Sequence, residues 1–533
     1  MKPILELENL SINYKTQNGV IEACKNISLM INKGDIVGII GESGSGKSTL
    51  ISSILGAVNK SAYIQSGKIK YYDKNNEIVE LISMNKKNVF YRNNSITGVL
   101  QSAQNALNPT LTIGQHFFET ALAHSPKSSF LYKQKFKSEI FTEAKKLLIS
   151  VGLSEEVLNA YSYQLSGGMK QRVIIAISLI LKPRILILDE PTTALDVITQ
   201  RQVLEILQSL NAKYTITIIF LTHDIGIISE LATKIAVMHE GKMVEFNSTE
   251  NILNYPTHAY TKKLMSCLTI TNPKTLISTE GLQTDNLIIL KDINLNINKK
   301  NILSNINLTI QKGEIVTIVG ESGSGKTTLG KVIVGGYTPT SGEILYENQN
   351  LNCISKVEYK KYKLKTQFIH QDVYSALNPN KTIYQTLTLP IFYHKLYKSR
   401  QDVLGKLKYY LSEVGLNPPE QFLNKYPSQL SGGQRQRILF ARALLMKPTL
   451  IIADEPVSMI DVALRIEMLN LIIKMNKKWG ISFVYITHDL VTASYISPNG
   501  KIVVMYKGRQ VEVGKVYETI QNPKHEYTKK LVG

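Results

Sequence analysis

Two glycine-rich loops are the first segments whose residue types and spacing could do chemistry. "GESGSGKS" (residues 41–48) and "GESGSGKT" (320–327) both fit the pattern G-x-x-x-x-G-K-[ST], and each directly follows a short apolar run. In such a loop the backbone N–H groups wrap a phosphate, the lysine reaches the outer phosphates and the hydroxyl binds Mg²⁺, while the helix that follows presents its positive N-terminus. Two matches in one chain predict two nucleotide-phosphate sites. The residues predicted to bind phosphate are Gly41, Glu42, Ser43, Gly44, Ser45, Gly46, Lys47, Ser48, Thr49, Gly320, Glu321, Ser322, Gly323, Ser324, Gly325, Lys326, Thr327 and Thr328.

Two adjacent acids follow a later apolar run in each half of the chain. Asp189 and Asp454 end the runs "ILILD" and "LIIAD", where a carboxylate can hold Mg²⁺ through water. A single aspartate at a strand end is usually a cap or a turn residue. Here Glu190 and Glu455 follow at once, and the second acid is placed to polarise an attacking water as general base. We therefore expect both glutamates to be catalytic.

A histidine ends the next apolar run in each half, in "FLTHD" and "YITHD". A buried structural histidine is the usual interpretation of either one alone. However, His223 and His488 are 265 positions apart, which is also the separation of Ser166 and Ser431. This recurrence favours a contact with the γ-phosphate, so we expect both histidines to take part in catalysis.

The chain is a tandem repeat, and a repeat decides how a long sequence is divided. Between the loop lysine and the shared serine the first half has 119 positions and the second has 105, and insertions of that kind sit in surface loops. Both halves close on a similar tail, "PTHAYTKKL" from Pro256 and "PKHEYTKKL" from Pro523. We predict domains at 1–265 and 285–533, joined by a linker at 266–284 that lacks hydrophobic periodicity.

The elements that must position these residues are short Val/Ile/Leu runs that alternate with amphipathic stretches. "DIVGIIG" and "EIVTIVG" precede the loops, "RILILDE" and "TLIIADE" carry the acids, and "TITIIFLTHD" and "ISFVYITHD" carry the histidines. Continuous apolar runs of this length are typical of strands buried on both faces of a parallel sheet. The expected fold is α/β, with helices covering the sheet.

Length and composition exclude several classes of protein. The 533 residues are 43% hydrophobic and 20% charged, which suits at least two globular domains. The longest apolar stretch, from Arg172, is interrupted at Lys182 well before the roughly 20 apolar residues of a membrane helix. The start shows no secretion signal, so we expect a cytoplasmic protein. Three separated cysteines argue against disulfides and zinc sites, and the net charge of +20 is scattered rather than gathered into a nucleic-acid patch.

The order of the motifs resembles that of a known family. "GESGSGKS", "LSGGMKQR", "LILDEPTTALD" and "LTHD", followed by "GESGSGKT", "LSGGQRQR", "IIADEPVSMID" and "ITHD", look like two ATP-binding cassettes of ABC transporters fused in one chain. The resemblance covers nearly the whole length. It implies two RecA-like P-loop cores, each with a helical subdomain that carries the LSGGQ-type signature, and ATP hydrolysis with Mg²⁺. It also implies that the two cassettes pair head to tail within the chain, with two ATP molecules between them.

The signature segments, 165–172 and 430–437, contain no catalytic group of their own. A Ser-Gly-Gly turn at a helix start offers a phosphate a hydroxyl, open backbone N–H groups and a helix dipole. An N-cap is the simpler interpretation, since serine is favoured there, but a cap does not explain the shared residues downstream. The resemblance implies that each signature closes the site of the other cassette, so that Ser431 and Gly433 face the ATP held by Lys47. The residues implied in this role are Ser166, Gly167, Gly168, Ser431, Gly432, Gly433 and Gln434.

Two further pairs of family positions transfer residue by residue. Gln101 in "VLQSAQNALNP" and Gln371 in "FIHQDVYSALNP" match the Q-loop glutamine, which senses Mg²⁺ and couples to the membrane subunit. Asp196 in "TALD" and Asp461 in "SMID" match the D-loop, although the family usually has "SALD". The Mg²⁺ ligands that the resemblance implies are Ser48, Asp189, Gln101, Thr327, Asp454 and Gln371.

The adenine contact differs between the two halves. Tyr14 matches the aromatic residue that stacks on adenine in the family, a contact worth about 1 kcal/mol. Aligning "ILELENLSINY" with "LIILKDINLNI" places Ile297 opposite Tyr14. Both halves keep the lysine, the Mg²⁺ ligand, the glutamate and the histidine. We therefore expect two hydrolytic sites of unequal nucleotide affinity.

Two details narrow the class of transporter. "ALNP" after each Q-loop glutamine and the "P-x-H-x-Y-T-K-K-L" tails resemble the ATPases of oligopeptide, dipeptide and nickel importers. That resemblance implies a peripheral ATPase on the cytoplasmic face of the membrane, two integral-membrane permease subunits, and an extracellular binding protein that selects a peptide, nickel or a metal chelate. Nucleic acid is not an expected partner. The alternative is a soluble tandem-cassette ATPase that acts on ribosomes or nucleic acid, although such proteins usually have a long charged linker; an exporter motor would more often carry a fused membrane domain.

Overall fold

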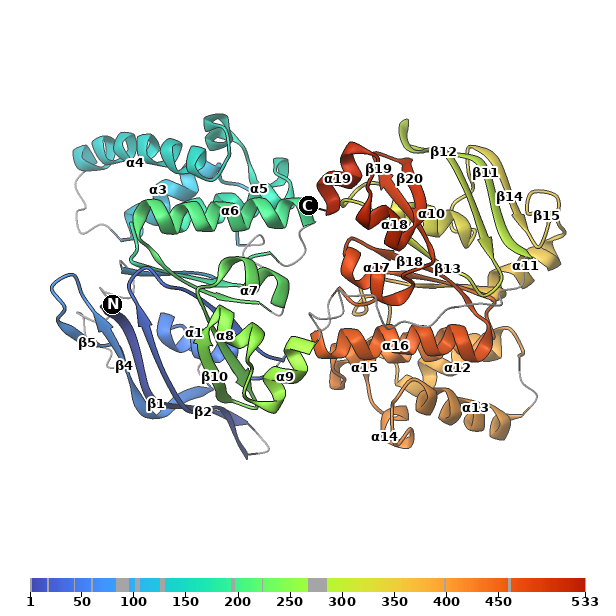
Figure 1. Ribbon diagram of the computed structural model, residues 1–533, viewed down its shortest axis with the longest axis horizontal. Coiled ribbons are helices and arrows are strands. Elements are labelled where there is room, and N and C mark those ends of the chain that lie inside the picture. Colours follow the sequence, from blue (N-terminus) through green and yellow to red (C-terminus); the bar gives the residue numbers. More distant parts are fainter. Residues whose placement is uncertain are drawn as a thin grey trace. The chain divides into compact units, whose positions relative to one another are not determined.

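The computed structural model describes residues 2–16, 19–42, 44–58, 61–82, 95–100, 106–124, 130–192, 197–222, 224–266, 285–396, 399–458 and 462–532. They form two compact units, the first made of Met1–Leu195 and Thr199–Leu268 and the second made almost entirely of Thr269–Gly533 (Figure 1). Within these described ranges no helix is both long and apolar enough to cross a membrane. Of the predicted linker, 266–284, only Ser266 lies in the described part.

The first unit contains two sheets. The larger sheet has six strands in the order β10 (Lys242–Ser248), β9 (Lys234–His239), β3 (Ile36–Ile40), β8 (Thr217–Leu221), β7 (Ile185–Asp189) and β6 (Ile96–Val99). Its strands are parallel except β10, which runs antiparallel to β9. The smaller sheet is antiparallel, in the order β2 (Gly19–Asn32), β1 (Pro3–Thr16), β4 (Ala62–Tyr72) and β5 (Ile78–Glu80).

The second unit repeats this plan strand for strand. Its six-stranded sheet has the order β16 (Thr366–Ile369), β17 (Leu450–Asp454), β18 (Ser482–Thr487), β13 (Ile315–Val319), β19 (Lys501–Tyr506) and β20 (Arg509–Lys515). Only the outer strand β20 is antiparallel to its neighbour. The four-stranded antiparallel sheet has the order β12 (Lys300–Gln311), β11 (Asn286–Ile297), β14 (Ser341–Tyr346) and β15 (Gln349–Asn350).

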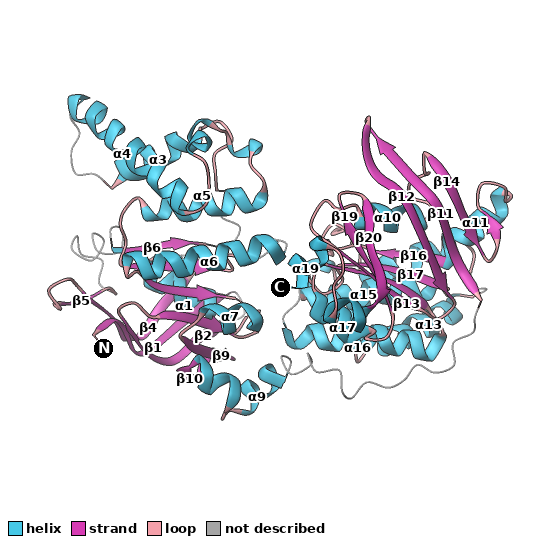
Figure 2. Cartoon of the chain, turned by 45° about the horizontal axis from the view of Figure 1, so that its top comes forward, coloured by secondary structure: helices cyan, strands magenta, loops and turns pink. Residues whose placement is uncertain are grey.

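Helices cover the sheets and form a separate helical group in each unit. In the described part of the first unit they are α1 (Lys47–Leu55), α3 (Ile113–Ala123), α4 (Phe130–Ser150), α5 (Gly167–Leu179), α6 (Val197–Tyr214), α7 (Ile225–Leu231), α8 (Thr249–Asn254) and α9 (Ala259–Ser266). Figure 2 shows α3, α4 and α5 gathered beside one another, and they contact each other. This group carries the signature segment at the start of α5.

The second unit has a matching set of helices. They are α10 (Lys326–Ile333), α11 (Lys356–Lys365), α12 (Ile383–Tyr393), α13 (Arg400–Glu413), α14 (Glu420–Leu423), α15 (Gly432–Leu445), α16 (Val462–Trp479), α17 (Leu490–Ile496), α18 (Val516–Gln521) and α19 (Glu526–Val532). Here α12, α13 and α15 contact one another, and the signature begins α15.

One apolar core joins the two sheets of each unit through the helix that follows the glycine-rich loop. In the first unit, Leu50, Ile51 and Ile54 of α1 are buried together with side chains from both sheets. Leu329, Val332 and Ile333 of α10 occupy the same place in the second. Each buried leucine or isoleucine contributes about 1.5–3 kcal/mol relative to an exposed one, so these contacts hold the loop helix firmly against the sheets.

The α/β fold with a RecA-like core and a helical subdomain is confirmed. The apolar runs form the predicted strands: β3 and β13 lead into the loops, β7 and β17 carry the acids, and β8 and β18 lead to the histidine positions. Because these strands are parallel neighbours, their carboxyl ends meet at one edge of the sheet, where ligands bind in open α/β folds. The antiparallel sheets were not predicted from the sequence.

Candidate active site

The first glycine of each glycine-rich loop lies close to the backbone of a neighbouring strand of the six-stranded sheet. That strand is β9 in the first unit and β19 in the second. Gly41 has a φ of 156° and Gly320 a φ of 153°, values that strongly favour glycine. A Cβ atom on Gly41 would lie 2.1 Å from the carbonyl oxygen of Met238, and one on Gly320 would lie 2.2 Å from that of Met505. The first glycine of each loop is therefore required by a close backbone approach.

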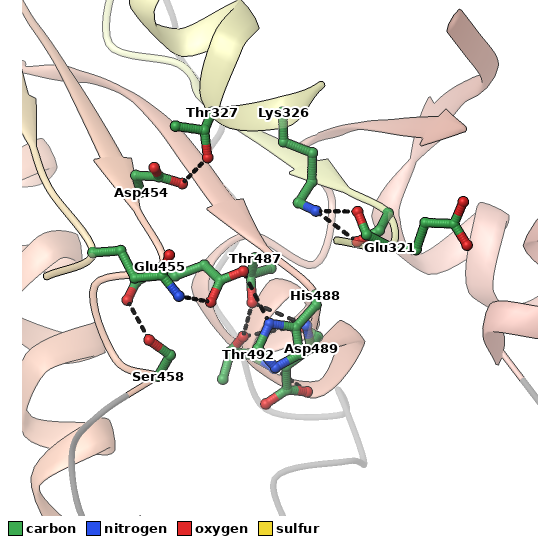
Figure 3. A network of polar contacts seen from close by, with 12 residues as sticks. Glu321, Lys326, Thr327, Asp454, Glu455, Ser458, Thr487, His488, Asp489 and Thr492 are labelled. Atoms are coloured by element: carbon green, nitrogen blue, oxygen red, sulfur yellow. Dashed lines mark hydrogen bonds and ion pairs between the residues drawn. The ribbon is translucent and has the colours of Figure 1, made fainter. Parts of the chain in front are cut away.

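The loop lysine of each unit folds back over the start of its own loop. Lys47 Nζ donates to the carbonyl oxygens of Gly41 (2.7 Å) and Glu42 (2.8 Å). Lys326 Nζ donates to those of Gly320 (2.8 Å) and Glu321 (2.7 Å), as Figure 3 shows in part. Each ammonium group is thus held at the mouth of a loop of backbone N–H groups, where it can turn to a phosphate.

In the second unit the aspartate that ends β17 lies beside the threonine hydroxyl of the glycine-rich loop. Thr327 Oγ1 donates to Asp454 Oδ1 at 3.2 Å (Figure 3). Burial and the charge of Glu455 raise the pKa of Asp454 to about 6, although Thr327 and nearby lysines act in the opposite direction. In the first unit burial and the charge of Glu190 raise the pKa of Asp189 in the same way. Each site therefore holds a buried carboxylate that a cation would stabilise.

Glu455 is the hub of the polar network in the second unit. Its Oε2 accepts from Nε2 of Gln371 at 2.7 Å, and its Oε1 lies 3.1 Å from Nδ1 of His488 (Figure 3 for the histidine). The structure therefore brings together the predicted Q-loop glutamine, glutamate and histidine. Burial raises the pKa of Glu455, but the hydrogen bond and charge of His488 and the charge of Lys326 lower it more, so the net pKa is below its usual value.

The backbone at the two glutamates is unusual. Glu190 has a φ of 51° and Glu455 a φ of 44°, in the left-handed region that non-glycine residues rarely adopt. Each is held there by its own N–H, which donates to Leu221 O or Ile486 O of the neighbouring strand at 2.9 Å. Such strain persists at functional sites when the surroundings fix it. The sequence gives no signal of this conformation.

His488 is held by the residues on either side of it. The Asp489 N–H donates to Thr487 Oγ1 at 3.0 Å, and the Asp489 carboxylate caps α17 by accepting from Val491 N at 2.8 Å. Burial lowers the pKa of His488, but the hydrogen bond and charge of Glu455 raise it more, so its pKa is above the usual value. Asp224 caps α7 in the first unit through Gly226 N at 2.9 Å.

Five predicted site residues lie outside the described part of the chain. They are Ser43, Gln101, Asp196, His223 and Asp461. The counterpart of the Gln371–Glu455–His488 group is therefore described in the first unit only by Glu190. The remaining residues of both loops, and Asp189 and Asp454, lie at the predicted edge of the sheet.

The signature serines are both helix N-caps. Ser166 Oγ accepts from Met169 N at 3.3 Å, and Ser431 Oγ accepts from Gln434 N at 3.3 Å. Ser431 N in turn donates to Oε1 of Gln434 at 3.1 Å, which completes a capping box. Both serines are exposed at the start of their helices. The helix N-terminus is thus presented outward, with the hydroxyl engaged locally.

The environment of the first glycine-rich loop includes Tyr14. Its hydroxyl lies 3.2 Å from Oγ1 of Thr49, so the ring lies near the start of α1. Ile12 pairs with Cys24 in the first unit, and Leu295 pairs with Leu303 at the corresponding place in the second. Tyr14 lies two positions after Ile12, and Ile297 lies two positions after Leu295. The structure therefore agrees with the sequence alignment that placed Ile297 opposite Tyr14.

The residues at the strand edge fit a magnesium ion that is completed by ligands from outside the protein. Thr327 and Asp454 offer two hard oxygen donors, and burial makes the negative charge of Asp454 costly without a cation. No group of three or more His, Cys, Asp or Glu residues able to hold a metal occurs among the residues that the structure describes. Mg²⁺ prefers this arrangement of few protein ligands plus phosphate oxygens and waters.

Sequence reasoning missed the role of the tails. The tyrosine of each "H-x-Y-T-K-K-L" segment reaches the glycine-rich loop, since Glu42 N donates to Tyr260 Oη at 3.1 Å and Glu321 N donates to Tyr527 Oη at 2.6 Å. From the sequence the tails served only to mark the end of each half and the family. Their recurrence in both halves was the available signal.

Comparison with protein families gives two matches. The model described as ABC transporter matches residues 24–193 and 303–458. The model described as oligopeptide/dipeptide transporter, C-terminal region, matches residues 244–288.

Comparison with individual proteins extends the match to the whole chain. The glutathione import ATP-binding protein GsiA of Escherichia coli (strain K12) is 33% identical, over 99% of this chain and 89% of its own length. A dimeric post-hydrolysis structure of the ATP-binding cassette MJ0796 bound to ADP and Pi is 31% identical, with a TM-score of 0.39, and covers 43% of this chain and 99% of that one. The structure of cbiO1 from Clostridium perfringens is 26% identical, with a TM-score of 0.41, and covers 45% of this chain and 92% of that one.

Proposed function

Because the chain belongs to the ABC transporter family as an ATP-hydrolysing import subunit, we propose that its cargo is a peptide. The observation that carries this proposal is the full-length match to a protein named for import of glutathione, which is itself a tripeptide. The match of residues 244–288 to the oligopeptide/dipeptide region supports the same class. Nickel or a metal chelate is the second candidate cargo, since the tails resemble those importers too.

We propose that the importer also includes membrane permeases, because the relative that matches the whole chain is named an import ATP-binding protein. We propose two permease subunits and an extracellular binding protein that delivers the cargo. The ATPase then lies at the cytoplasmic face of the membrane as a peripheral subunit. The relative that matches the whole chain is named an import protein, which supports this assignment over a ribosome-bound ATPase.

In the proposed reaction the glycine-rich loops bind the nucleotide phosphates and the loop lysines neutralise their charge. Glu455 has a lowered pKa and is ionised at neutral pH, so its carboxylate can accept the proton of an attacking water. His488 holds that carboxylate in place and can donate toward the γ-phosphate. Glu190 and His223 take the same roles in the first unit. Bound Mg²⁺, held by Ser48 and Asp189 or by Thr327 and Asp454, would neutralise charge on the phosphates.

The two cassettes are proposed to pair head to tail. The outward-facing helix start at Ser431 then completes the site of Lys47, and that at Ser166 completes the site of Lys326. ATP binding closes the pair and drives the permeases to change access, while hydrolysis reopens it. The energy for movement therefore comes from nucleotide contacts made only in the closed state.

Uptake in a strain that lacks this protein tests the proposal. Labelled glutathione, labelled di- and oligopeptides and radioactive nickel are supplied to cells that carry the wild-type chain or the Glu190→Gln/Glu455→Gln double variant. We expect peptide uptake to return with the wild-type chain only. Nickel uptake restored without peptide uptake would contradict the peptide assignment. A chain that sediments with ribosomes rather than membranes would contradict the importer assignment.

A further inference from the structure

The tail of each unit is fastened to the outer strand of the six-stranded sheet by one glutamate. Glu245 of β10 accepts from Thr257 N at 3.0 Å and from His258 N at 3.1 Å. Glu512 of β20 accepts from Lys524 N at 3.1 Å and from His525 N at 3.0 Å. The two tails thus begin with the same carboxylate cap.

The histidine of the motif shapes the next turn. His258 Nδ1 accepts from Tyr260 N at 3.2 Å, and His525 Nδ1 accepts from Tyr527 N at 3.0 Å. This turn directs the tyrosine inward, where only 7% of Tyr260 and 5% of Tyr527 remains exposed. Tyr260 stacks on His239 with ring centroids 4.0 Å apart. Tyr527 stacks on Tyr506 at 4.3 Å.

The hydroxyl at the end of this network binds the first peptide group of the glycine-rich loop. In the first unit that group is formed by the carbonyl of Gly41 and the N–H of Glu42. Its N–H donates to Tyr260 Oη at 3.1 Å, and its carbonyl accepts from Lys47 Nζ at 2.7 Å. Since the two ends of a trans peptide group point in opposite directions, the tyrosine and the lysine hold it from both sides.

The second unit repeats this arrangement with different neighbours. The carbonyl of Gly320 accepts from Lys326 Nζ at 2.8 Å, and the N–H of Glu321 donates to Tyr527 Oη at 2.6 Å. The stacking partner changes from histidine to tyrosine between the units, yet the hydroxyl stays on the same N–H. A contact that serves only to bury the ring would not need to keep that partner.

We infer that Tyr260 and Tyr527 are positioning residues for the phosphate-binding lysines, and that each tail thereby sets the nucleotide affinity of its own unit. The tyrosine fixes the plane of the first loop peptide, and the plane decides where the carbonyl holds the lysine ammonium. Without the hydroxyl the peptide can rotate, and the lysine loses its defined position. The inference depends on the proposal that the two loops are the nucleotide-phosphate sites.

The test is ADP binding to the purified full-length chain by titration calorimetry, one site at a time. Lys326→Ala leaves the first site to be measured, and Lys47→Ala leaves the second. In these backgrounds Tyr260→Phe and Tyr527→Phe remove one hydroxyl and keep the ring. Losing one net hydrogen bond to the loop should raise the Kd of the affected site by about two- to tenfold. In the otherwise wild-type chain, KM for ATP should rise more than kcat falls, because binding is what weakens.

Exposed tyrosines next to the tail helices provide matched controls. Tyr255→Phe and Tyr517→Phe alter residues that are 75% and 48% exposed, and both should leave the Kd unchanged. Glu245→Gln is a second test variant that loosens the tail without touching the loop, and it should raise the Kd of the first site in the same direction. It also keeps the inference testable if Tyr260→Phe does not fold.

Two outcomes separate the possible failures. If Lys47→Ala and Lys326→Ala leave both ADP sites intact, the assignment of the loops as phosphate sites is wrong. If the lysine variants abolish binding but the tyrosine variants only lower the melting temperature, with Kd and KM unchanged, the tyrosines merely tether the tails and the positioning inference is overturned.

Discussion

Replacing Glu455 by glutamine keeps the shape of the side chain and removes its charge. In the structure that charge faces Gln371 Nε2 at 2.7 Å and His488 Nδ1 at 3.1 Å. A general base typically accelerates its reaction by about 10²–10⁴-fold, equivalent to roughly 3–5 kcal/mol, so turnover at the second site should fall to background. Glu190→Gln should do the same at the first site.

Steady-state phosphate release from the full-length chain measures this loss, with ADP binding as the control for folding. The turnover of the wild-type chain is the sum of the turnover at its two sites, and each single variant keeps only the turnover of the unaltered site. The two sites cannot both contribute more than half of the total. At least one of the two single variants must therefore fall to half or less, and the double variant should be inactive. If Glu190→Gln and Glu455→Gln each keep more than half of the turnover, at least one of the two glutamates is not the base, and the assignment of both is wrong.

The same variant gives a second, independent measurement at His488. The pKa of this buried histidine is raised because Glu455 outweighs the effect of burial. In Glu455→Gln only the charge of Asp489 still raises the pKa of His488, while burial continues to lower it. The pKa of His488 should therefore fall. NMR titration of labelled histidine follows this, with His488→Gln to assign the signal. An unchanged titration would show that the pair does not form in solution.

Three further predictions concern the acid, the signature helix and the pairing of the cassettes. The pKa of Asp454 is raised from 3.8 to about 6. The stability that its protonated form provides is therefore present below pH 3.8 and is lost as the pH rises through about 6. Thermal melts of the nucleotide-free chain should show this loss in the wild type and not in Asp454→Asn. A Cβ on Gly168 would lie 2.3 Å from Thr199 Cγ2, whereas one on Gly432 meets nothing within 4 Å. Gly168→Ala should therefore lower the free energy of unfolding by about 1–3 kcal/mol in denaturant melts, while Gly432→Ala is tolerated. Ser431→Ala should weaken nucleotide trapping at the Lys47 site rather than the Lys326 site, and the reverse result would contradict head-to-tail pairing.

The parallel sheets were predictable from sequence because their strands are buried on both faces. β3, β7 and β8 are fully buried five-residue runs, and so are β13 and β17. β1 is harder to predict because its pairing with β2 shifts register between Leu7 and Leu10 and again before Ile12 and Asn13. Each shift interrupts the alternation that identifies a half-buried strand.

The order of site residues along the chain was predictable, but their contacts were not. Lysine, aspartate, glutamate and histidine each follow a strand, and parallel pairing places them at one edge. The contact between Gln371 and Glu455 joins residues 84 positions apart, and it depends on where β16 ends relative to β17. The bond from Tyr527 to the loop spans 206 positions and needs the whole tail in place. Contacts of this kind belong to the tertiary structure and leave no periodic signal.

The differences between the two units lie around the chemical groups rather than in them. The first peptide of the loop is joined to the lysine and to the tail tyrosine by the same hydrogen bonds in both units. Tyr14 beside the first loop is replaced by Ile297, while the second loop helix gains Lys331, whose charge lowers the pKa of Asp454, at the position of Ser52. We propose that the lost aromatic surface weakens the hold of the second unit on a base, whereas the charge of Lys331 favours the ionised form of Asp454, which is the form that would hold Mg²⁺. The two changes would therefore act on nucleotide affinity in opposite directions, and they leave the proposed groups for hydrolysis duplicated.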